Sequence, residues 1–235
     1  MSLQGQVAIV TGASKGIGKA IARSFAKEEM KVVLTARTKS ELDKVADEVK
    51  QLGGEPLVIP ADVSRGQAVD QLISQTLETF GKIDILINNA GMGVFAPIDE
   101  LSVQDFDKMF AINMRGVFLC TRAVLPHMKN QKSGAIINIS SLAGKNFFKG
   151  GGGYAASKWA LNGFTKCLML EAREYDIRVS VVCPGSVATE FSPHSGKDPA
   201  KILQTNDVAD AVLTILRLPQ NALMSEVDLR PSNPK

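Results

Sequence analysis

Tyr154 and Lys158 are the two residues whose types and spacing most directly suggest chemistry. They stand four positions apart at the start of a segment with helical apolar spacing, so their side chains are predicted to share one helix face. A free phenol has a pKa of about 10, too high for ready proton exchange at neutral pH, and a neighbouring ammonium group is expected to lower that pKa. Tyr154 could then donate a proton to a carbonyl oxygen or take one from an alcohol. A tyrosine and a lysine at this spacing can equally be ordinary surface residues.

Ser141 and Asn113 are polar residues that could assist such a proton transfer. Ser141 lies thirteen residues before Tyr154, directly after an apolar strand-like run, and its hydroxyl could hydrogen-bond an oxygen that gains negative charge. It could also be a helix cap or a turn residue. Asn113 lies inside a helical pattern, although asparagine is a mediocre helix former. It could face solvent, or it could hold a water that replenishes the proton on Lys158.

A glycine-rich turn near the N-terminus could bind an anion. An apolar run ends at Thr11, the turn holds Gly12, Gly16 and Gly18, and a helical pattern follows. The first N–H groups of a helix have no intrahelical partners and its dipole favours negative charge there. Glycines would let the backbone approach a pyrophosphate without Cβ clashes. Plain strand-to-helix turns are also rich in glycine, so the interpretation depends on the rest of the chain.

Arg37 indicates which dinucleotide this turn would accept. In NAD-binding folds an acidic residue roughly twenty positions past the glycines holds the ribose 2′-hydroxyl. Here the second expected strand ends at Ala36 and Arg37 follows, so a cation stands where a carboxylate would. A guanidinium can bind a 2′-phosphate through two hydrogen bonds, and Lys15 would lie on the same side. We therefore predict NADP(H) in preference to NAD(H), with ordinary surface cations as the alternative.

Strand-like and helix-like segments alternate along the whole chain. Several strand candidates are almost continuously apolar, as expected for strands covered on both faces of a parallel sheet. The pattern predicts an α/β fold: one doubly wound Rossmann-type domain over residues 1–235, with about seven parallel strands and helices on both faces. Polar residues follow most of the strands, and the carboxyl ends of such strands meet at one edge. The expected strands are residues 6–11, 31–36, 56–61, 83–88, 134–140, 177–183 and 222–229.

Composition excludes several classes of function. The net charge of the 235 residues is only +3, with no basic run, which argues against nucleic acid as a partner. No apolar run reaches membrane-spanning length and no signal-peptide pattern is present, so we expect a cytoplasmic protein. Cys120, Cys167 and Cys183 are widely spaced and read as thiols in a reducing compartment. His127 and His194 belong to no cluster with metal-ligand spacing, so no metal site is expected.

Taken together in chain order, these motifs resemble those of the short-chain dehydrogenase/reductase family. The resemblance extends from about Gly5 to Gly185, with weaker similarity through the last expected strand. The matching motifs are Thr11-Gly12-x-x-x-Gly16-x-Gly18, Asn88-Asn89-Ala90-Gly91, Asn113-Met114-Arg115-Gly116, Ser141, Tyr154-x-x-x-Lys158 and Pro184-Gly185.

The resemblance implies roles for individual residues. Asn113, Ser141, Tyr154 and Lys158 would form a catalytic tetrad. Asp62 and Val63 would contact adenine, Lys158 would also bind the nicotinamide ribose, and Thr189 would bond the carboxamide. The cofactor-binding residues would then be Gly12, Ser14, Lys15, Gly16, Ile17, Gly18, Arg37, Asp62, Val63, Asn89, Ala90, Gly91, Tyr154, Lys158, Pro184, Gly185 and Thr189. Family members are usually dimers or tetramers, which often pair the helices expected here within 102–128 and 154–173.

The resulting hypothesis is an NADPH-dependent carbonyl reductase acting on a ketone, an aldehyde or a 3-oxoacyl compound. The chain is similar to 3-oxoacyl-acyl-carrier-protein reductases and to general ketone reductases, and the first resemblance adds an acyl thioester to the candidate substrates. Those reductases often end in a Thr-Gly-x-x-x-x-Val-Asp-Gly-Gly type segment, whereas this chain reads differently from Leu223 to Pro231, which puts an acyl-carrier partner in doubt. The alternatives are a non-catalytic NADP-binding sensor or scaffold, and an epimerase or dehydratase on the same fold.

Two loops are expected to border the substrate, one on each side of the pocket, and the second is the mobile glycine run at 150–153. The segment of about 186–206 would form a short substrate loop, containing Pro193, Gly196 and Pro199. An apolar pocket wall could be built from four residues, although simple packing explains them equally well: Met92, Val94, Phe147 and Phe148.

Overall fold

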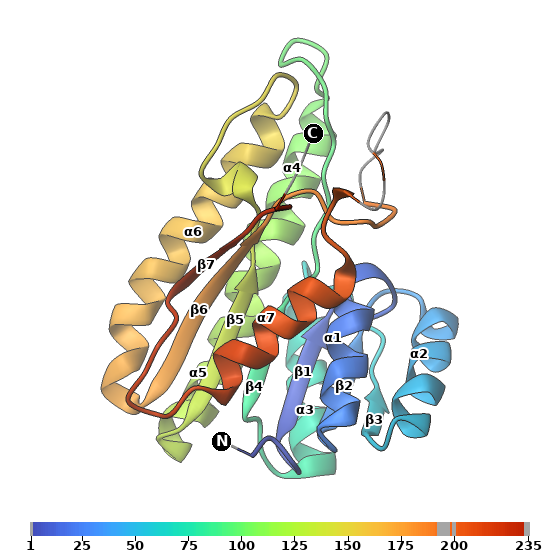
Figure 1. The fold of residues 1–235 in the computed structure, drawn as a ribbon, viewed down its shortest axis with the longest axis vertical. Coiled ribbons are helices and arrows are strands. Elements are labelled where there is room, and N and C mark those ends of the chain that lie inside the picture. The colour runs from blue at the N-terminus through green and yellow to red at the C-terminus, as the bar shows by residue number, and fades with distance from the viewer. Residues whose placement is uncertain (1, 192–197, 199–200, 233–235) are drawn as a thin grey trace.

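A single parallel sheet forms the centre of the molecule. The computed structural model describes residues 2–191, 198 and 201–232, and within them seven strands pair in the order β3-β2-β1-β4-β5-β6-β7. The chain starts in the middle of the sheet, winds outward to β3, then returns to β4 and winds the other way to β7, which confirms the doubly wound prediction (Figure 1). The strands are β1 (Val7–Thr11), β2 (Lys31–Thr35), β3 (Glu55–Val58), β4 (Ile85–Asn88), β5 (Gly134–Ile139), β6 (Ile177–Pro184) and β7 (Glu226–Leu229).

Helices cover both faces of this sheet (Figure 1). The helices α1 (Gly16–Lys27), α2 (Lys39–Gln51) and α7 (Thr205–Arg217) bury their apolar sides in one core cluster. The opposite cluster takes residues from α3 (Gly66–Phe80), α5 (Val117–Gln131) and α6 (Gly152–Ala172). The short helix α4 (Val103–Phe110) leads into α5 through a π-helical turn, η1 (Ala111–Gly116). Among the helices described, none combines the length and apolar character that a membrane span needs.

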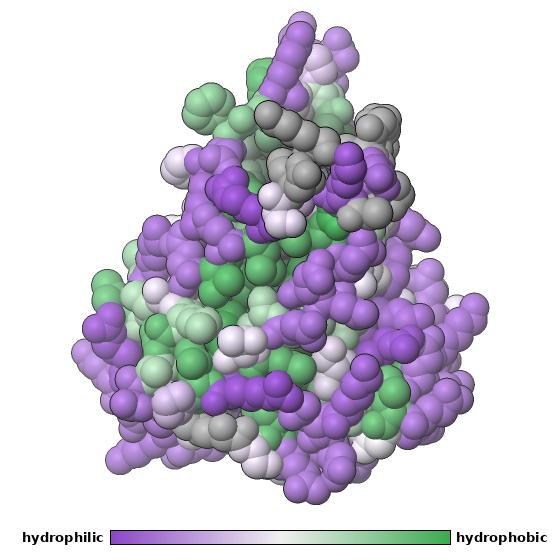
Figure 2. Space-filling view, viewed as in Figure 1, coloured by the Kyte–Doolittle hydropathy of each residue, from purple (hydrophilic) through white to green (hydrophobic). Residues whose placement is uncertain are grey.

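The alternation of side chains along each strand explains why both faces need a cover. In β1, Ala8 and Val10 belong to one core cluster, whereas Val7 and Ile9 belong to the other. Because successive side chains of a strand point to opposite faces, a continuously apolar strand is stable only between two layers of helices. Figure 2 shows apolar residues at the surface over β6, β7 and α7, among mostly hydrophilic residues elsewhere on this face.

The expected strand boundaries differ from the observed ones by two residues or more at three places. The third strand ends at Val58 rather than at 61. The Ile59 N–H still donates to the Leu34 oxygen of β2, and the Ala61 N–H donates to the Ala36 oxygen just beyond β2, so pairing fades there gradually. The fourth strand begins at Ile85 rather than at 83, and the seventh begins at Glu226 rather than at 222.

A chain of buried amides and hydroxyls ties the two central strands to the helices behind them. Asn88 Nδ2 donates to Asn138 Oδ1 at 2.8 Å and to Thr121 Oγ1 at 3.3 Å. Asn138 Nδ2 in turn donates to Thr165 Oγ1 at 2.8 Å. All four side chains are buried, so each hydrogen bond replaces one that water would otherwise supply. The network fixes the ends of β4 and β5 against α5 and α6.

The first prediction concerns this network. Replacing Asn138 by alanine leaves the buried partners at Asn88 and Thr165 without their hydrogen bonds. The free energy of unfolding is expected to fall by about 3 kcal/mol, measured by urea denaturation. The exposed helical residue Asn130 provides a control, because Asn130→Ala should cost less than about 0.5 kcal/mol. Similar losses for the two variants would contradict a stabilising role of the network.

Candidate active site

A large cleft lies along the carboxyl edge of the sheet. Its volume is about 2180 Å³, and residues that follow each of the seven strands line it. In doubly wound sheets this edge is where ligands bind, at the point where the strand order reverses. The reversal here lies between β1 and β4. Of the site residues expected from the sequence, the cleft brings together the glycine turn, Arg37, Asp62, Asn89, Ser141, Tyr154, Lys158 and Thr189.

The glycine turn is tight because two of its residues have left-handed backbone conformations. Gly12 has φ +65° and Gly16 has φ +57°, values that residues with a Cβ rarely adopt. Gly18 begins the first turn of α1 so close to β1 that a Cβ there would lie 2.3 Å from the Gly12 oxygen. The N-terminus of α1 therefore opens directly into the cleft, with no side chain blocking it at these positions.

Thr11 and Asn89 join the two loops that flank the reversal point. Thr11 Oγ1 accepts hydrogen bonds from the backbone N–H groups of Asn89 at 2.9 Å and Ala90 at 3.0 Å. Asn89 Nδ2 donates back to the carbonyl oxygens of Thr11 at 2.9 Å and Gly12 at 3.2 Å. Thr11 was quoted in the sequence motif without a role, so its function as a positioning residue was missed. Its position at the last residue of the first strand was the available signal.

Two oppositely charged residues follow the second and third strands. Arg37 is exposed directly after β2, and Asp62 follows β3 on the same edge. Burial alone would raise the pKa of Asp62, but hydrogen bonds from the Ser64 hydroxyl and N–H and the charges of Arg37 and Arg65 lower it overall. Asp62 is thus held as a carboxylate at neutral pH.

Lys15 reaches across the mouth of the cleft. Its ammonium group pairs with the Glu190 carboxylate at 3.3 Å, and both side chains are exposed. Thr189, next to Glu190, lies against the glycine turn, since a Cβ on Gly16 would meet Thr189 Cγ2 at 3.4 Å. The start of the 186–206 segment thus approaches the turn, while Pro193, Gly196 and Pro199 lie outside the described residues, as does His194.

Asn113 is buried in the π-helical turn and does not face solvent. Its Oδ1 accepts from the Met92 N–H at 2.8 Å, and its Nδ2 donates to the Met92 oxygen at 2.8 Å and to Ser157 Oγ at 2.9 Å. The solvent-facing alternative is therefore wrong. The side chain holds the loop after β4 against α6, one turn from the tyrosine, and π-helical turns of this kind are frequent at functional sites.

Ser141, Tyr154 and Lys158 meet at the inner end of the cleft. Tyr154 and Lys158 lie one turn apart on α6, and are 7% and 4% exposed. The Lys158 ammonium donates to the Ile139 oxygen at 3.0 Å and lies 5.9 Å from the centre of the Tyr154 ring. The Ser141 side chain hydrogen-bonds with the phenol and accepts from the Ala143 N–H at 3.1 Å. By contrast Ser140 is part of the sheet pairing, donating its N–H to Val182 at 2.8 Å.

Burial dominates the ionisation of this pair. It raises the pKa of Tyr154 to about 12, and the hydrogen bond with Ser141 offsets only part of the effect. It lowers the pKa of Lys158 to about 8, against a small opposing influence of Cys183. The pKa of the phenol is thus raised overall and not lowered as expected, because desolvation exceeds the lowering effect of the Ser141 hydrogen bond. Tyr154 carries its proton at neutral pH.

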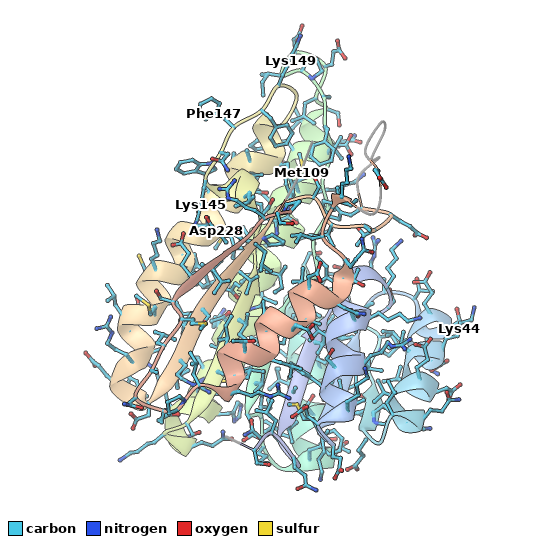
Figure 3. The ribbon with its side chains drawn as sticks, in the orientation of Figure 1. Lys44, Met109, Lys145, Phe147, Lys149 and Asp228 are labelled. Carbon is cyan, nitrogen blue, oxygen red and sulfur yellow. The ribbon has the colours of Figure 1, made fainter. Side chains whose placement is uncertain are left out.

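A partly exposed ion-pair cluster beside the cleft was not anticipated. Cys183, Glu226 and Asp228 place one ligand atom each within 4.8 Å of one another, an arrangement that could hold a metal ion. The Lys145 ammonium, however, pairs with both carboxylates, and Lys145 and Asp228 point toward one another in Figure 3. This cluster ties the turn after β5 to β7. The signal was the pair of acidic residues at alternate positions of the last strand.

The proposed apolar wall is only partly present. Met92 and Val94 pack against a small buried cluster of Met109, Ala143 and Tyr154, so they adjoin the phenol. Phe147 is among the residues that line the cleft, but it is 93% exposed and projects from the end of its loop in Figure 3, so its ring lies at the open rim.

Comparison with known proteins agrees with this geometry. Residues 6–200 match the family described as short chain dehydrogenase. An uncharacterized oxidoreductase of Staphylococcus saprophyticus is 39% identical over 98% of this chain and 99% of its own length. A 3-oxoacyl-[acyl-carrier-protein] reductase of Synechocystis is 41% identical over 84% of this chain and 81% of its own. Among solved structures, a metagenomic short-chain oxidoreductase in complex with NADP has a TM-score of 0.88 and 40% identity, covering 99% of both chains.

The fold and the cleft define an oxidoreductase of the kind that uses a nicotinamide cofactor. The chain belongs to the short-chain dehydrogenase/reductase family.

The second prediction tests the buried charge of Lys158. Since its pKa of about 8 in the fold lies below the usual 10.5, the unfolded chain binds more protons between these pH values, and stability rises with pH there. Relative to Lys158→Met, the free energy of unfolding of the natural protein should rise by about 1 kcal/mol per pH unit from about pH 8 to about pH 10. Denaturant titrations at several pH values measure this slope.

Lys166, an exposed lysine of the same helix, supplies the control for this slope. The free energy of unfolding of Lys166→Met, plotted against pH, should run parallel to that of the natural protein. If the Lys158→Met curve also runs parallel, Lys158 is not desolvated as described.

Proposed function

We propose that this protein is an NADPH-dependent carbonyl reductase. The observation that carries the proposal is the meeting of Ser141, Tyr154 and the buried Lys158 at the inner end of a cleft that begins at a helix N-terminus. When bound, NADPH supplies the hydride that reduces the carbonyl carbon. The chain itself must bind the cofactor, orient the carbonyl and deliver a proton to its oxygen.

The residues of the cleft fit a dinucleotide. A Cβ on Gly18 would lie 2.3 Å from the Gly12 oxygen, and one on Gly12 would lie 2.9 Å from the Ala90 Cα, so only glycines leave this cradle open. The free N–H groups at the start of α1 would hold the pyrophosphate. Asp62 and Val63 would border the adenine, and Lys158 the nicotinamide ribose. The remaining contacts would come from residues that all line the cleft, namely Ser14, Ile17, Asn89, Gly91, Pro184, Gly185 and Thr189.

Tyr154 acts in this mechanism as the proton donor. Burial keeps its phenol protonated at neutral pH, which suits a general acid in the reducing direction. Ser141 hydrogen-bonds the same oxygen that receives the proton and stabilises charge that develops there. Lys158, held by the Ile139 oxygen, places its positive charge beside the phenolate that remains after transfer. Asn113 helps to position these three residues through its contacts with Met92 and Ser157.

Arg37 and Lys15 support NADPH over NADH. Arg37 stands exposed after β2, where a carboxylate would repel a 2′-phosphate, and Lys15 can join it by exchanging Glu190 for the phosphate. The metagenomic relative of known structure carries NADP, which agrees with this choice. We also infer a homodimer or homotetramer, supported by exposed apolar residues on α5 and α6, namely Phe118, Trp159 and Leu170.

A non-catalytic sensor or scaffold is the competing function. Such a protein would need the cleft but not the hydrogen bond between Ser141 and Tyr154 beside a fully buried lysine. Turnover therefore separates the two functions, and binding alone does not.

The third prediction tests the proton donor. Tyr154→Phe should lower the rate of NADPH-dependent carbonyl reduction at least about 100-fold, because it removes the hydroxyl proposed to donate the proton, while NADPH still binds. Absorbance of NADPH measures the rate, and fluorescence titration measures binding. Tyr175→Phe changes the other tyrosine of the chain and should leave the rate unchanged. Near-normal turnover of Tyr154→Phe would refute this role.

The fourth prediction tests the choice of cofactor. Arg37→Asp removes the guanidinium and adds a repelling carboxylate, so the Kd for NADPH should rise at least about tenfold more than the Kd for NADH. Arg173→Asp makes the same charge change at an exposed residue beyond α6 and should alter neither value. Equal losses for the two nucleotides in Arg37→Asp would remove the basis for a 2′-phosphate contact.

A further inference from the structure

Three phenylalanine rings from three different loops gather around Tyr154. Phe95 follows β4, Phe148 follows β5 and Phe191 follows β6. The Phe95 ring meets the Tyr154 ring edge-to-face, with centres 5.4 Å apart and planes at 73°. The Phe191 ring lies 5.8 Å from the Tyr154 ring, and Phe148 lies 5.9 Å from Phe95. These loops are far apart in sequence, and the fold brings them together beside the proposed proton donor.

Two glycines make room for the rings. A Cβ on Gly93 would lie 2.9 Å from Phe95 Cζ and 3.2 Å from Phe191 Cε1, so both rings rest over the same glycine. A Cβ on Gly151 would lie 2.4 Å from Phe148 Cζ. Any larger residue at Gly93 would push Phe95 and Phe191 out of their places. The ring arrangement is therefore built into the backbone of the loops.

The rings are packed on one side and open on the other. Phe95, Phe148 and Phe191 are 37%, 47% and 42% exposed, and all three line the cleft that Tyr154 closes. Tyr154 also belongs to a small apolar cluster with Met109 and Ala143, against which Met92, Val94 and Leu101 pack. Glu190, the charged neighbour of Phe191, turns to Lys15 instead. A ligand at this place meets half-exposed aromatic surface, which it would remove from water.

We propose that the substrate is a neutral aromatic ketone or aldehyde, whose ring packs against Phe95 and Phe191 while its carbonyl oxygen reaches Tyr154 and Ser141. This inference rests on the carbonyl reductase function and deepens it. Aromatic rings attract one another edge-to-face beyond the gain from burial, because the positive ring edge meets the negative ring face. The pocket already uses this geometry between Phe95 and Tyr154. A linear 3-oxoacyl thioester has no ring and would gain burial only.

The experiment compares two substrates of similar size, acetophenone and cyclohexyl methyl ketone, on matched variants. Phe95→Leu and Phe191→Leu keep an apolar side chain but remove the ring. Each should lower kcat/KM about tenfold for acetophenone and at most about twofold for the cyclohexyl ketone. Comparing each variant with the natural protein on one substrate cancels the different reactivities of the two ketones. Product formation is followed by NADPH absorbance and chromatography.

Phe106→Leu supplies the control. Phe106 is 40% exposed and forms a ring pair with Phe110 at 4.8 Å, so it resembles the tested residues, but it does not line the cleft. It should leave both substrates unchanged. Circular dichroism confirms that each variant is folded, and because the two tested residues lie on different loops, either one decides the matter if the other fails to fold.

The outcomes separate this inference from the function on which it rests. A selective loss for acetophenone supports it. Equal losses for the two ketones, or an enzyme that reduces ethyl acetoacetate or a 3-oxoacyl thioester but not acetophenone, would overturn the aromatic substrate and leave the carbonyl reductase function standing. Failure to reduce any of these carbonyls with NADPH would overturn both.

Discussion

The structure depends on the joining of the β1 and β4 ends where the strand order reverses. Parallel strands bring all their carboxyl ends to one edge, and the crevice opens where the chain turns from one half of the sheet to the other. Four hydrogen bonds span that point. Thr11 Oγ1 accepts from the N–H groups of Asn89 and Ala90, and Asn89 Nδ2 donates to the Thr11 and Gly12 oxygens. Without this link, the glycine turn and the loop toward the aromatic rings would have no fixed relation to each other.

Burial is the second principle that connects fold and chemistry. The same packing that excludes water from the inner cleft keeps the Tyr154 phenol protonated and makes the Lys158 cation costly. The protein compensates with fixed polar partners, the Ile139 oxygen for Lys158 and Ser141 for Tyr154. The buried amides of Asn88, Asn113 and Asn138 hold the strands and helices that carry these partners. The same desolvated groups therefore contribute both to the stability of the fold and to the proposed chemistry.

The two ends of the cleft differ in chemical character, and each end suits a different ligand. At the outer end, Lys15, Arg37 and the N-terminus of α1 offer positive charge and N–H groups to an anionic dinucleotide. At the inner end, Phe95, Phe148 and Phe191 surround the phenol with apolar aromatic surface. A charged cofactor and an uncharged substrate would thus each meet the surface that suits its chemistry, with the reacting atoms between them.

The sequence by itself determined the fold class, the seven strands within a few residues and the family, because apolar periodicity and the glycine spacing are local properties of the chain. It also singled out Ser141, Tyr154 and Lys158, which the fold brings together, although it could not show that Asn113 is buried. Only the tertiary structure decided the direction of the Tyr154 pKa, since desolvation depends on neighbours from several strands. Only the tertiary structure showed that Phe95 and Phe191, rather than the exposed Phe147, are the ring neighbours of the phenol. It also showed that Lys145 pairs with Glu226 and Asp228. Contacts between loops about 40 to 100 residues apart leave no periodic signal in a single sequence.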